Sequence, residues 1–373
     1  MKKLWRDLPA FSPPQAVSGR LTITGLKAWR MKEPVSGRRY TVVRVESAAG
    51  AGWGEGGPAP ATQIAAARSV VTGRRATDNE FIRYALAGSP AMEAAVSNAM
   101  LDLTARSAGV PVYRYLGGPT RYKARLLAHI DGTNEDALAS SVSRAAQQGF
   151  KAFTLPIPSR DAMWRMQAYV DAIRKRVDRL KAAAGPGGDF VLDAKATLTP
   201  GDAGFIATAF EKDHLLWLDE PTSVVTSESL AKITGESVMP VGVGRNILDV
   251  SQFQSLLRFG CVQILRPDAG LNSMLKLKRM AAVAETNYVA IGPYHDGGPA
   301  ATAAAIHLAA SLPNFFIQQV PRPSAEQDRA MRAELTSGDR ETATGGFAAL
   351  INKPGLGFEM SEQALNRYSE ERL

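Results

Sequence analysis

Hydrophobic and polar residues alternate along residues 20–56, in the runs LTITGLKAWRM, RRYTVVRVES and GWGEG. A period of two is typical of strands that bury one face, so this stretch predicts two or three antiparallel strands. Between residues 61 and 108 the spacing becomes helical and rich in alanine, and the pattern ends at Gly109 and Pro111. We therefore predict a separate N-terminal α+β domain over residues 1–122.

From about residue 123, short apolar runs of strand type recur and alternate with segments of helical spacing. The runs are ARLLAHI, FKAFTL, DFVLDA, LLWLD, PVGVG, CVQIL, YVAIG and NFFIQQ. Strands that alternate with helices predict crossover units and a parallel sheet, and eight such strands close a barrel. This α/β barrel is predicted over residues 123–338. The tail, residues 339–373, returns to strand and turn patterns, and we expect it to rejoin the N-terminal domain.

Composition limits the classes of protein that fit this pattern. The chain has 373 residues and 45% hydrophobic content, enough for one large domain and a smaller one. The net charge of +8 favours small anionic ligands, but the basic residues are scattered and not interleaved with aromatic residues, which argues against nucleic acid. No stretch approaches the ~20 apolar residues of a membrane helix. Trp5, Arg6 and Asp7 interrupt any secretory signal, so we expect a cytoplasmic protein with no membrane partner.

Several residues that could carry chemistry have a simpler interpretation. Cys261 is the single cysteine, which excludes an intrachain disulfide and a multi-thiolate metal site, and its apolar run CVQIL predicts a buried thiol. The segments GGPAP and GPGG lack a lysine followed by Ser or Thr, so they are not a nucleotide-binding P-loop. We interpret His214 and His307 as structural residues on the helix or loop side of the barrel.

Charged residues follow several of the predicted strands. Asp193 and Lys195 lie in VLDAK, Asp219 and Glu220 in LWLDEP, and Arg245 in GVGRN. Because the carboxyl ends of parallel barrel strands converge on one face, these side chains are expected to be neighbours. Each acidic residue could instead cap its own loop, since Asp is common in turns. The position at the barrel mouth favours a site.

The order and spacing of these motifs resemble the mandelate racemase/muconate lactonizing enzyme-like branch of the enolase superfamily. The resemblance covers nearly the whole chain from about residue 20 and rests on VRVES…GWGEG, AVSNAMLDLTARSAGVPVYRYLGG, the spaced strand ends, PDAGLNS, PNFFIQQ and PGLGFEM. It implies an α/β fold, a modified (β/α)₇β TIM-type barrel with an N-terminal α+β capping domain, in a dimer or octamer. It also implies abstraction of a proton α to a carboxylate, with Mg²⁺ holding the enediolate.

The resemblance places three metal ligands at the ends of the third, fourth and fifth barrel strands. Asp193 stands at the first position, and Asp219 at the second, where Glu is usual and the neighbouring Glu220 could compensate. These oxygen ligands with water could hold Mg²⁺. The third position is Arg245, whose guanidinium cannot ligate a cation and would repel one, so Mg²⁺ is in doubt.

Arg245 therefore has three interpretations. It can pair with Asp193 and Asp219 and fill the metal position with an inert salt bridge. It can bind a substrate carboxylate with its planar fork of donors. It can also point aside and leave two carboxylates for a weakly held metal. We favour the first two interpretations together over the third.

The groups that would move protons also differ from the family pattern. Many relatives carry a Lys-x-Lys pair at the second strand end, where this chain has Thr154, Leu155 and Pro156, so no base is expected there. Lys195 lies two residues after Asp193 and would face the same way in a strand, where it either moves a proton or pairs with an acid. In GPYHDGGP, Tyr294 occupies the usual catalytic His position, His295 follows it, and the sixth-strand Asp partner persists as Asp268.

Four more residues are candidates for contact with substrate. His129 ends the first barrel strand, and Gln319 stands at the eighth strand end, where relatives commonly carry a carboxylate. Arg38 and Arg39 lie in MKEPVSGRRY, which corresponds to the loop that closes over substrate in relatives. They could contact an anion, although exposed arginines usually face water.

Two hypotheses for function follow. The first is an enzyme that acts on a small carboxylate of the acid-sugar type by α-proton abstraction, as a dehydratase or as a racemase or epimerase. The second is a catalytically silent member of the family that binds an acid ligand or has a structural or regulatory role. The fold does not decide between them.

Overall fold

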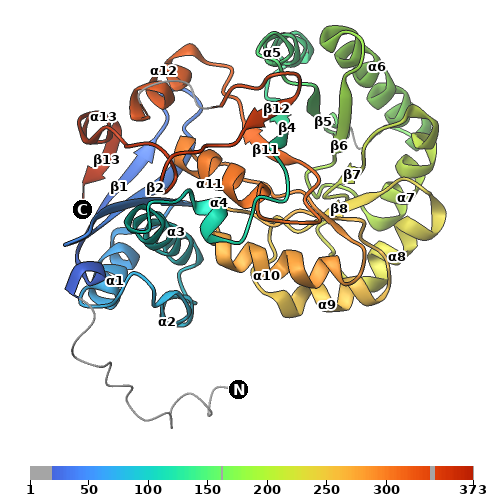
Figure 1. The fold of residues 1–373 in the computed structure, drawn as a ribbon. Helices are drawn as coiled ribbons and strands as arrows, with labels where there is room; N and C mark the ends of the chain where they lie inside the picture. Colours follow the sequence, from blue (N-terminus) through green and yellow to red (C-terminus); the bar gives the residue numbers. More distant parts are fainter. Residues whose placement is uncertain (1–18, 161–162, 337–340, 373) are drawn as a thin grey trace.

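Two sheets organise residues 19–160, 163–336 and 341–372, the part of the chain that the computed structural model describes (Figure 1). The first is an antiparallel sheet of four strands in the order β13-β1-β2-β3; the alternation in residues 20–56 predicts three of them, and the fourth, β13, comes from the tail. Its strands are β1 (Ile23–Lys32), β2 (Arg39–Ser47), β3 (Gly50–Gly56) and β13 (Ser369–Arg372). The predicted signal-interrupting residues Trp5, Arg6 and Asp7 lie outside the described residues.

A row of glycines explains the GWGEG motif in β3. Gly52, Gly54 and Gly56 face α3 (Pro90–Ser107), and a Cβ atom on any of them would lie 2.0–2.1 Å from a carbonyl oxygen of that helix. A strand with no side chains on one face allows the helix backbone to approach directly. The other helices of this cap are α1 (Ala61–Val71), α2 (Asn79–Ala85) and α4 (Val112–Tyr115).

The second sheet has nine strands, of which eight are parallel, in the order β10-β9-β8-β7-β6-β5-β4-β11, and the ninth, β12 (Phe347–Ala349), pairs with β4. The eight parallel strands are β4 (Lys123–His129), β5 (Ala152–Pro156), β6 (Asp189–Asp193), β7 (Leu218–Asp219), β8 (Val241–Val243), β9 (Ile264–Leu265), β10 (Ala290–Ile291) and β11 (Gln318–Pro321). A bridge between Ile291 and Phe315, and a hydrogen bond of 3.2 Å from Gln319 N to Pro293 O, connect the two ends of the sheet. The predicted α/β barrel is therefore confirmed.

Seven helices of the described chain connect these eight strands and surround them, as a (β/α)₇β barrel requires (Figure 1). They are α5 (Glu135–Gln147), α6 (Met166–Ala184), α7 (Pro200–Ala209), α8 (Ser227–Glu236), α9 (Val250–Arg258), α10 (Met274–Glu285) and α11 (Pro299–Ala309). Five of them begin at a polar N-cap whose side chain accepts a backbone N–H, which stabilises the first turn. These N-caps are Asn134, Thr199, Thr226, Asp249 and Ser273.

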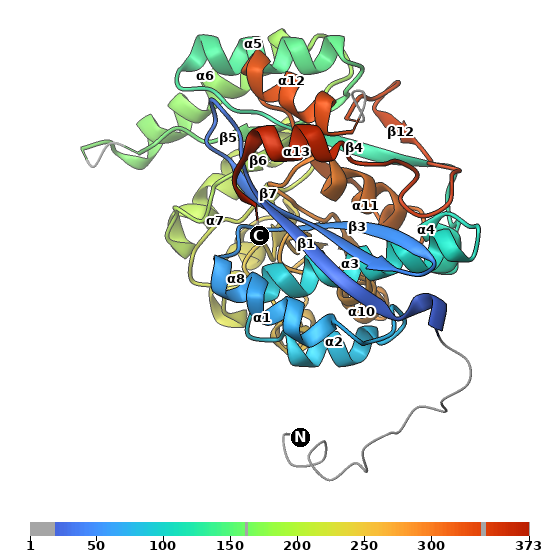
Figure 2. The ribbon, with the colours of Figure 1, turned by 90° about the vertical axis from the view of Figure 1, so that its left-hand side faces the viewer.

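The tail contacts both parts of the fold. After α12 (Glu326–Leu335), β12 (Phe347–Ala349) pairs antiparallel with β4 of the barrel. α13 (Glu362–Tyr368) then lies beside the cap sheet, and β13 pairs with β1 (Figure 2). The boundaries at residues 122 and 338 stay predictions, and residue 338 lies outside the described residues. None of the helices in the described ranges has the length and hydropathy needed to cross a bilayer.

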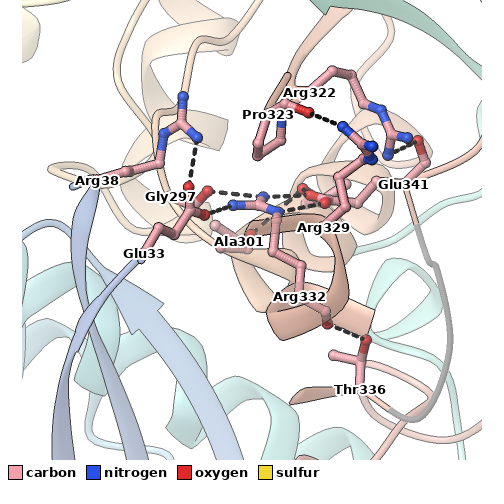
Figure 3. A network of polar contacts seen from close by, with 12 residues as sticks. Glu33, Arg38, Gly297, Ala301, Arg322, Pro323, Arg329, Arg332, Thr336 and Glu341 are labelled. Carbon is pink, nitrogen blue, oxygen red and sulfur yellow. Dashed lines mark hydrogen bonds and ion pairs between the residues drawn. The ribbon is translucent and has the colours of Figure 1, made fainter. Parts of the chain in front are cut away.

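A buried network of charges fixes the β1–β2 loop, residues 33–38, to the barrel (Figure 3). Arg332 of α12 contacts Glu33, and its Nε donates to Glu341 Oε2 at 2.6 Å. Glu33 also accepts from Arg38 at 2.8 Å, and Asp328 accepts from two backbone N–H groups of the loop. Burial opposes ionisation of Glu341, but Arg332 outweighs it and lowers the pKa of Glu341 to about 2. The position of the cap therefore depends on a few buried ion pairs.

We predict that Arg332→Met lowers the free energy of unfolding by on the order of 3–5 kcal/mol, because Glu33 and Glu341 stay buried without their shared cation. Urea titration measures the effect. The matched control is Arg367→Met, which breaks the exposed pair between Arg367 and Glu334 and should change stability little. Equal losses in the two variants would contradict the importance of the buried network.

Candidate functional site

A cavity of about 420 Å³ opens at the carboxyl ends of the barrel strands, and we call it the mouth cavity. Its lining combines residues that follow six different strands, as expected for this face of a barrel. The lining residues are His129, Asp193, Lys195, Ala196, Glu220, Arg245, Asn246, Asp268 and Tyr294. The structure thus brings together seven residues singled out from the sequence, and adds Ala196 and Asn246.

Asp219 lies between two arginines at the inner side of this cavity. Arg245 contacts Asp219 Oδ2 through Nη2, and the same nitrogen lies 3.2 Å from Asp193 Oδ2. Arg266 approaches from the other side, with Nε 2.9 Å from Asp219 Oδ1 and Nη2 3.3 Å from Oδ2. Burial opposes ionisation of Asp219, but Arg266 and Arg245 outweigh it and lower its pKa. Asp219 is therefore a fully compensated carboxylate.

Arg266 is the site residue that the sequence interpretation missed. Its side chain is completely buried, stacks over Trp217 at 5.2 Å, and donates to the carbonyl of Gly292. Trp217 Nε1 donates to Asp219 at 2.8 Å, so it joins the site to the packed barrel interior. That interior is a cluster contributed by separate strands: Leu127, Ala152, Val191, Trp217, Ile264 and Ile317. The signal was present in RPDAG, where Arg266 precedes Asp268 by two residues, the spacing of one strand face.

The carboxylates predicted as metal ligands do not fit a divalent cation here. Arg245 Nη2 lies between Asp193 and Asp219, where a shared cation would have to bind, and Arg266 contacts both oxygens of Asp219. A guanidinium at contact distance repels a metal ion. Within the described ranges, no three His, Cys, Asp or Glu side chains are grouped to hold a metal. The expected role of Asp193, Asp219 and Glu220 as Mg²⁺ ligands is not supported by this donor set.

Glu220 has a different environment from its neighbour Asp219. Its φ of 43° places it in the left-handed region, so its side chain leaves the strand direction. One carboxylate oxygen accepts from the backbone N–H groups of Gly244 at 2.7 Å and Arg245 at 2.8 Å. Burial and the adjacent Asp219 nevertheless raise the pKa of Glu220 to about 7. The surroundings of Glu220 therefore favour its protonated form more than those of an exposed glutamate do.

Asp268 and Tyr294 also line the mouth cavity and are joined through the backbone. Ala269 N donates to Tyr294 O at 2.7 Å, and Asp268 Oδ1 accepts from Gly270 N at 2.7 Å. Burial raises the pKa of Asp268 to about 7. The Tyr294 ring lies 4.7 Å from the Arg245 guanidinium carbon, and burial raises the pKa of the phenol, so it stays protonated. Both groups can exchange hydrogen bonds with a ligand.

Of the pair Tyr294 and His295, the tyrosine faces the mouth cavity and the histidine does not. His295 is buried on the side of Glu341, with its Nε2 3.3 Å from Thr302 Oγ1 and its Nδ1 accepting from Gly297 N. Burial lowers the pKa of His295 to about 4. Consecutive residues of an extended segment point in opposite directions, which explains the difference. The sequence left open which of the two residues faces the cavity, and the structure places Tyr294 there.

Lys195 lines the rim of the mouth cavity, but not for the reason expected. β6 ends at Asp193, and Lys195 has a φ of 50° and an exposed side chain, so the two residues do not share a strand face. Its backbone N–H donates to Asp193 Oδ1 at 3.0 Å. Its ammonium group forms no ion pair with the residues that the structure describes. Lys195 is therefore free to meet a ligand at the rim.

The two loop arginines do not line the mouth cavity. Arg38 is nearly buried and bound to Glu33 and to Asp296, the latter at 2.6 Å. Arg39 is exposed and pairs with Glu370 of β13. Their expected contact with substrate is therefore corrected, because both guanidiniums already have carboxylate partners. Thr154 is buried and its hydroxyl accepts from Ile130 N at 2.8 Å, so the second strand end supplies no base.

Gln319, which was expected to contact substrate, does not line the mouth cavity either. It is completely buried, accepts from Arg266, and its Nε2 lies 3.2 Å from His129 Nδ1. Gln319 therefore contacts a cavity residue and does not line the cavity itself. Cys261 is a buried free thiol, His307 is buried under Tyr113, and His214 is exposed, all away from the mouth.

A second cavity of about 440 Å³ adjoins the first, and we call it the side cavity. The two cavities share Ala196, Glu220 and Asn246. The side cavity adds uncharged polar groups from the loops after β7 and β8 and from α9, namely Thr222, Ser223, Gln252 and Ser255. Hydroxyl and amide groups of this kind can exchange hydrogen bonds with a polar ligand.

Comparison with known proteins places this geometry in context. Residues 137–364 match the family model described as Enolase C-terminal domain-like. The D-galactonate dehydratase of Verminephrobacter eiseniae is 28% identical over 279 residues, which cover 72% of this chain and 71% of that protein. The D-mannonate dehydratase of Caulobacter vibrioides is 27% identical over 307 residues, covering 75% and 74%. A solved mandelate racemase/muconate lactonizing enzyme-like protein from Rubrobacter xylanophilus superposes with a TM-score of 0.82 at 24% identity, over 95% of this chain and 98% of that one.

The raised pKa of Asp268 predicts a pH-dependent stability. The folded protein keeps this proton to about pH 7, whereas the unfolded chain releases it near the ordinary value of 3.8. The folded state binds more protons between these values, so stability falls as the pH rises through them. Asp268→Asn removes the group, and its stability relative to wild type should grow by about 2–3 kcal/mol between pH 5 and pH 8. Urea titrations at both pH values check this.

The control for that experiment is Asp171→Asn, at an exposed position of α6. Its stability relative to wild type should stay the same at the two pH values. A parallel pH dependence in wild type and Asp268→Asn would show that Asp268 ionises normally in the folded protein.

Proposed function

The chain belongs to the Enolase C-terminal domain-like family, and on that premise we propose that it is a hydro-lyase that removes water from a sugar acid. The match confirms the resemblance to the enolase superfamily noted from the sequence. Relatives named D-galactonate dehydratase and D-mannonate dehydratase support this substrate class. The observation that carries the proposal is one cavity lined by the Arg245 guanidinium and by two buried carboxyl groups, Glu220 and Asp268, whose burial raises their pKa values to about 7.

Arg245 is the group proposed to bind the carboxylate of the acid. Its side chain is 16% exposed and lines the mouth cavity. Its Nε is buried and has no hydrogen-bond partner among the residues described, although Nη2 is used by the two aspartates. A planar guanidinium with a free donor binds carboxylate oxygens directionally. The same donors would meet the negative charge that develops on those oxygens when the α-proton leaves.

Asp268 and Glu220 are proposed to move the protons. Ionised Asp268 takes the proton from C2 of the acid, and the electron pair of that C–H bond forms a C2=C3 double bond as the C3–O bond breaks. Protonated Glu220 gives its proton to the departing hydroxyl, which leaves as water. The enol product then becomes a 2-keto-3-deoxy acid. A pKa near the working pH suits both roles, since each group is then available in the required form.

This proposal assigns no step to Mg²⁺, because Asp193 and Asp219 are paired with arginine side chains. The uncharged polar groups of the side cavity are proposed to receive the distal hydroxyls of the substrate. The homo-oligomer and the cytoplasmic location stay predictions from the resemblance and the composition. Racemisation or epimerisation of the same acid is the alternative outcome of α-proton abstraction at this site.

A specific observation favours a second candidate, an acid-binding protein without catalysis. Asp193, Asp219, Arg245 and Arg266 form a set of two carboxylates and two guanidiniums whose formal charges cancel. A neutral set offers less stabilisation of a developing negative charge than a metal ion would. In this candidate the cavity binds a carboxylate and proton abstraction does not follow.

We expect wild-type protein to convert at least one aldonate, from a set that includes D-galactonate and D-mannonate, to a 2-keto-3-deoxy acid. The measurement is product formation, with incorporation of solvent deuterium at carbon followed by NMR. Asp268→Asn should lower turnover by about 10²- to 10⁴-fold because it removes the proposed base. Treatment with EDTA should leave turnover unchanged. Asp171→Asn, on the outer helix α6, serves as the control and should keep full activity.

Calorimetry with the same acids separates the two candidates. Turnover with wild type supports the lyase. Binding that Arg245→Lys weakens, with no deuterium exchange and no product, supports the silent binder and contradicts the lyase. If no acid of the set binds, both candidates fail.

A further inference from the structure

A buried chain of hydrogen bonds connects Asp219 to His129. Arg266 donates to Asp219 through Nε at 2.9 Å and to Gln319 Oε1 through Nη2. Gln319 Nε2 lies 3.2 Å from His129 Nδ1. Arg266 and Gln319 are completely buried, so no solvent competes for these contacts. At the far end of this chain, His129 lines the mouth cavity.

The chemistry of arginine fixes the direction of every bond in this chain. A guanidinium has only donors, so Gln319 must turn its carbonyl oxygen toward Arg266. The amide nitrogen of Gln319 then necessarily faces His129. An amide NH₂ can only donate, so His129 Nδ1 must accept and cannot carry a proton. A neutral imidazole with an unprotonated Nδ1 carries its proton on Nε2.

The surroundings of His129 also favour the neutral ring. Burial is the main effect and lowers the pKa of His129. Asp193 and Asp296 favour the imidazolium, while Arg38 and Arg245 oppose it. The donor of Gln319 adds to this opposition, because a proton on Nδ1 would point at an N–H group. His129 is therefore a poor candidate for a base, since one nitrogen is capped and the other holds the proton.

We propose that Gln319 and Arg266 are positioning residues that hold His129 as the neutral Nε2–H tautomer, so that His129 donates a hydrogen bond to an oxygen of the bound acid. His129 Nε2 has no hydrogen-bond partner among the described residues, and the ring lines the cavity, so this donor is available to a ligand. Only the identity of that ligand rests on the proposed function. The tautomer itself follows from the contacts of the free protein.

The test is the ¹⁵N NMR spectrum of the histidine rings in the free protein at pH 7. The chain has four histidines, so a single His129→Asn variant assigns the signals of His129. The expected result for wild type is an unprotonated Nδ1 and a protonated Nε2. An Nδ1–H tautomer or an imidazolium at pH 7 would overturn the proposal. This measurement needs no variant of the buried residues, so it stands even where such a variant does not fold.

The Gln319→Glu variant tests whether Gln319 determines the tautomer of His129. A glutamate there can accept from both Arg266 and His129, so the proton should move to Nδ1, and the pKa of His129 should rise by one unit or more. The matched control is Gln148→Glu, which makes the same change at a glutamine that also accepts from an arginine, Arg322, and does not contact His129. It should leave the His129 spectrum unchanged. An unchanged spectrum in folded Gln319→Glu would contradict the positioning role.

Activity then separates this inference from the proposed function. Once a substrate is identified, Gln319→Glu should lower kcat/KM by about 10- to 100-fold, as expected when a donor to a charged oxygen is lost. The predicted tautomer in a protein that binds no acid would support the positioning of His129 and reject the proposed function. Turnover by a protein in which His129 is the Nδ1–H tautomer would support the proposed function and reject the positioning of His129.

Discussion

The ion pairs of Asp219 with Arg245 and Arg266 are the constraint on which the barrel mouth depends. A carboxylate without exposure to water must be compensated, and here the compensation comes from the ends of the two following strands. This arrangement places Arg245 against Tyr294, aligns Arg266 with Gln319, and leaves Glu220 to be held by backbone N–H groups. The chemistry available in the mouth cavity therefore depends on the fact that arginine side chains, and not a metal ion, compensate Asp219.

The cap is joined to the rest of the fold by close backbone packing and by buried ion pairs. The glycine row of β3 allows α3 to approach the sheet, and the pairs around Arg332 fix the β1–β2 loop against α12. Arg38 belongs to this network and forms ion pairs with Glu33 and Asp296. Arg38 therefore does not line the mouth cavity, whereas Arg245 does.

Much of the fold could be predicted from the sequence, because alternation and helical spacing are local properties. The same holds for the strand ends, which is why Asp193, Glu220, Arg245 and Asp268 are found around one cavity. The direction in which each side chain points could not be predicted from the sequence in the same way. His295 points away from the mouth cavity, toward Thr302, because consecutive residues alternate in direction. Lys195 does not share a strand face with Asp193 because its backbone is in the left-handed region. Arg266 was missed because its burial depends on Asp219, 47 positions away along the chain.

The double clamp on Asp219 also bears on how such a site could change over evolutionary time. Loss of Arg245 alone would leave Arg266 on both oxygens of Asp219, and loss of Arg266 alone would leave a buried amide, Gln319, without its donor. Binding of a divalent metal ion at Asp219 would thus require at least two coordinated replacements, and each single replacement would leave the interior charges unbalanced. The two arginines are therefore coupled through the folding stability of the barrel mouth.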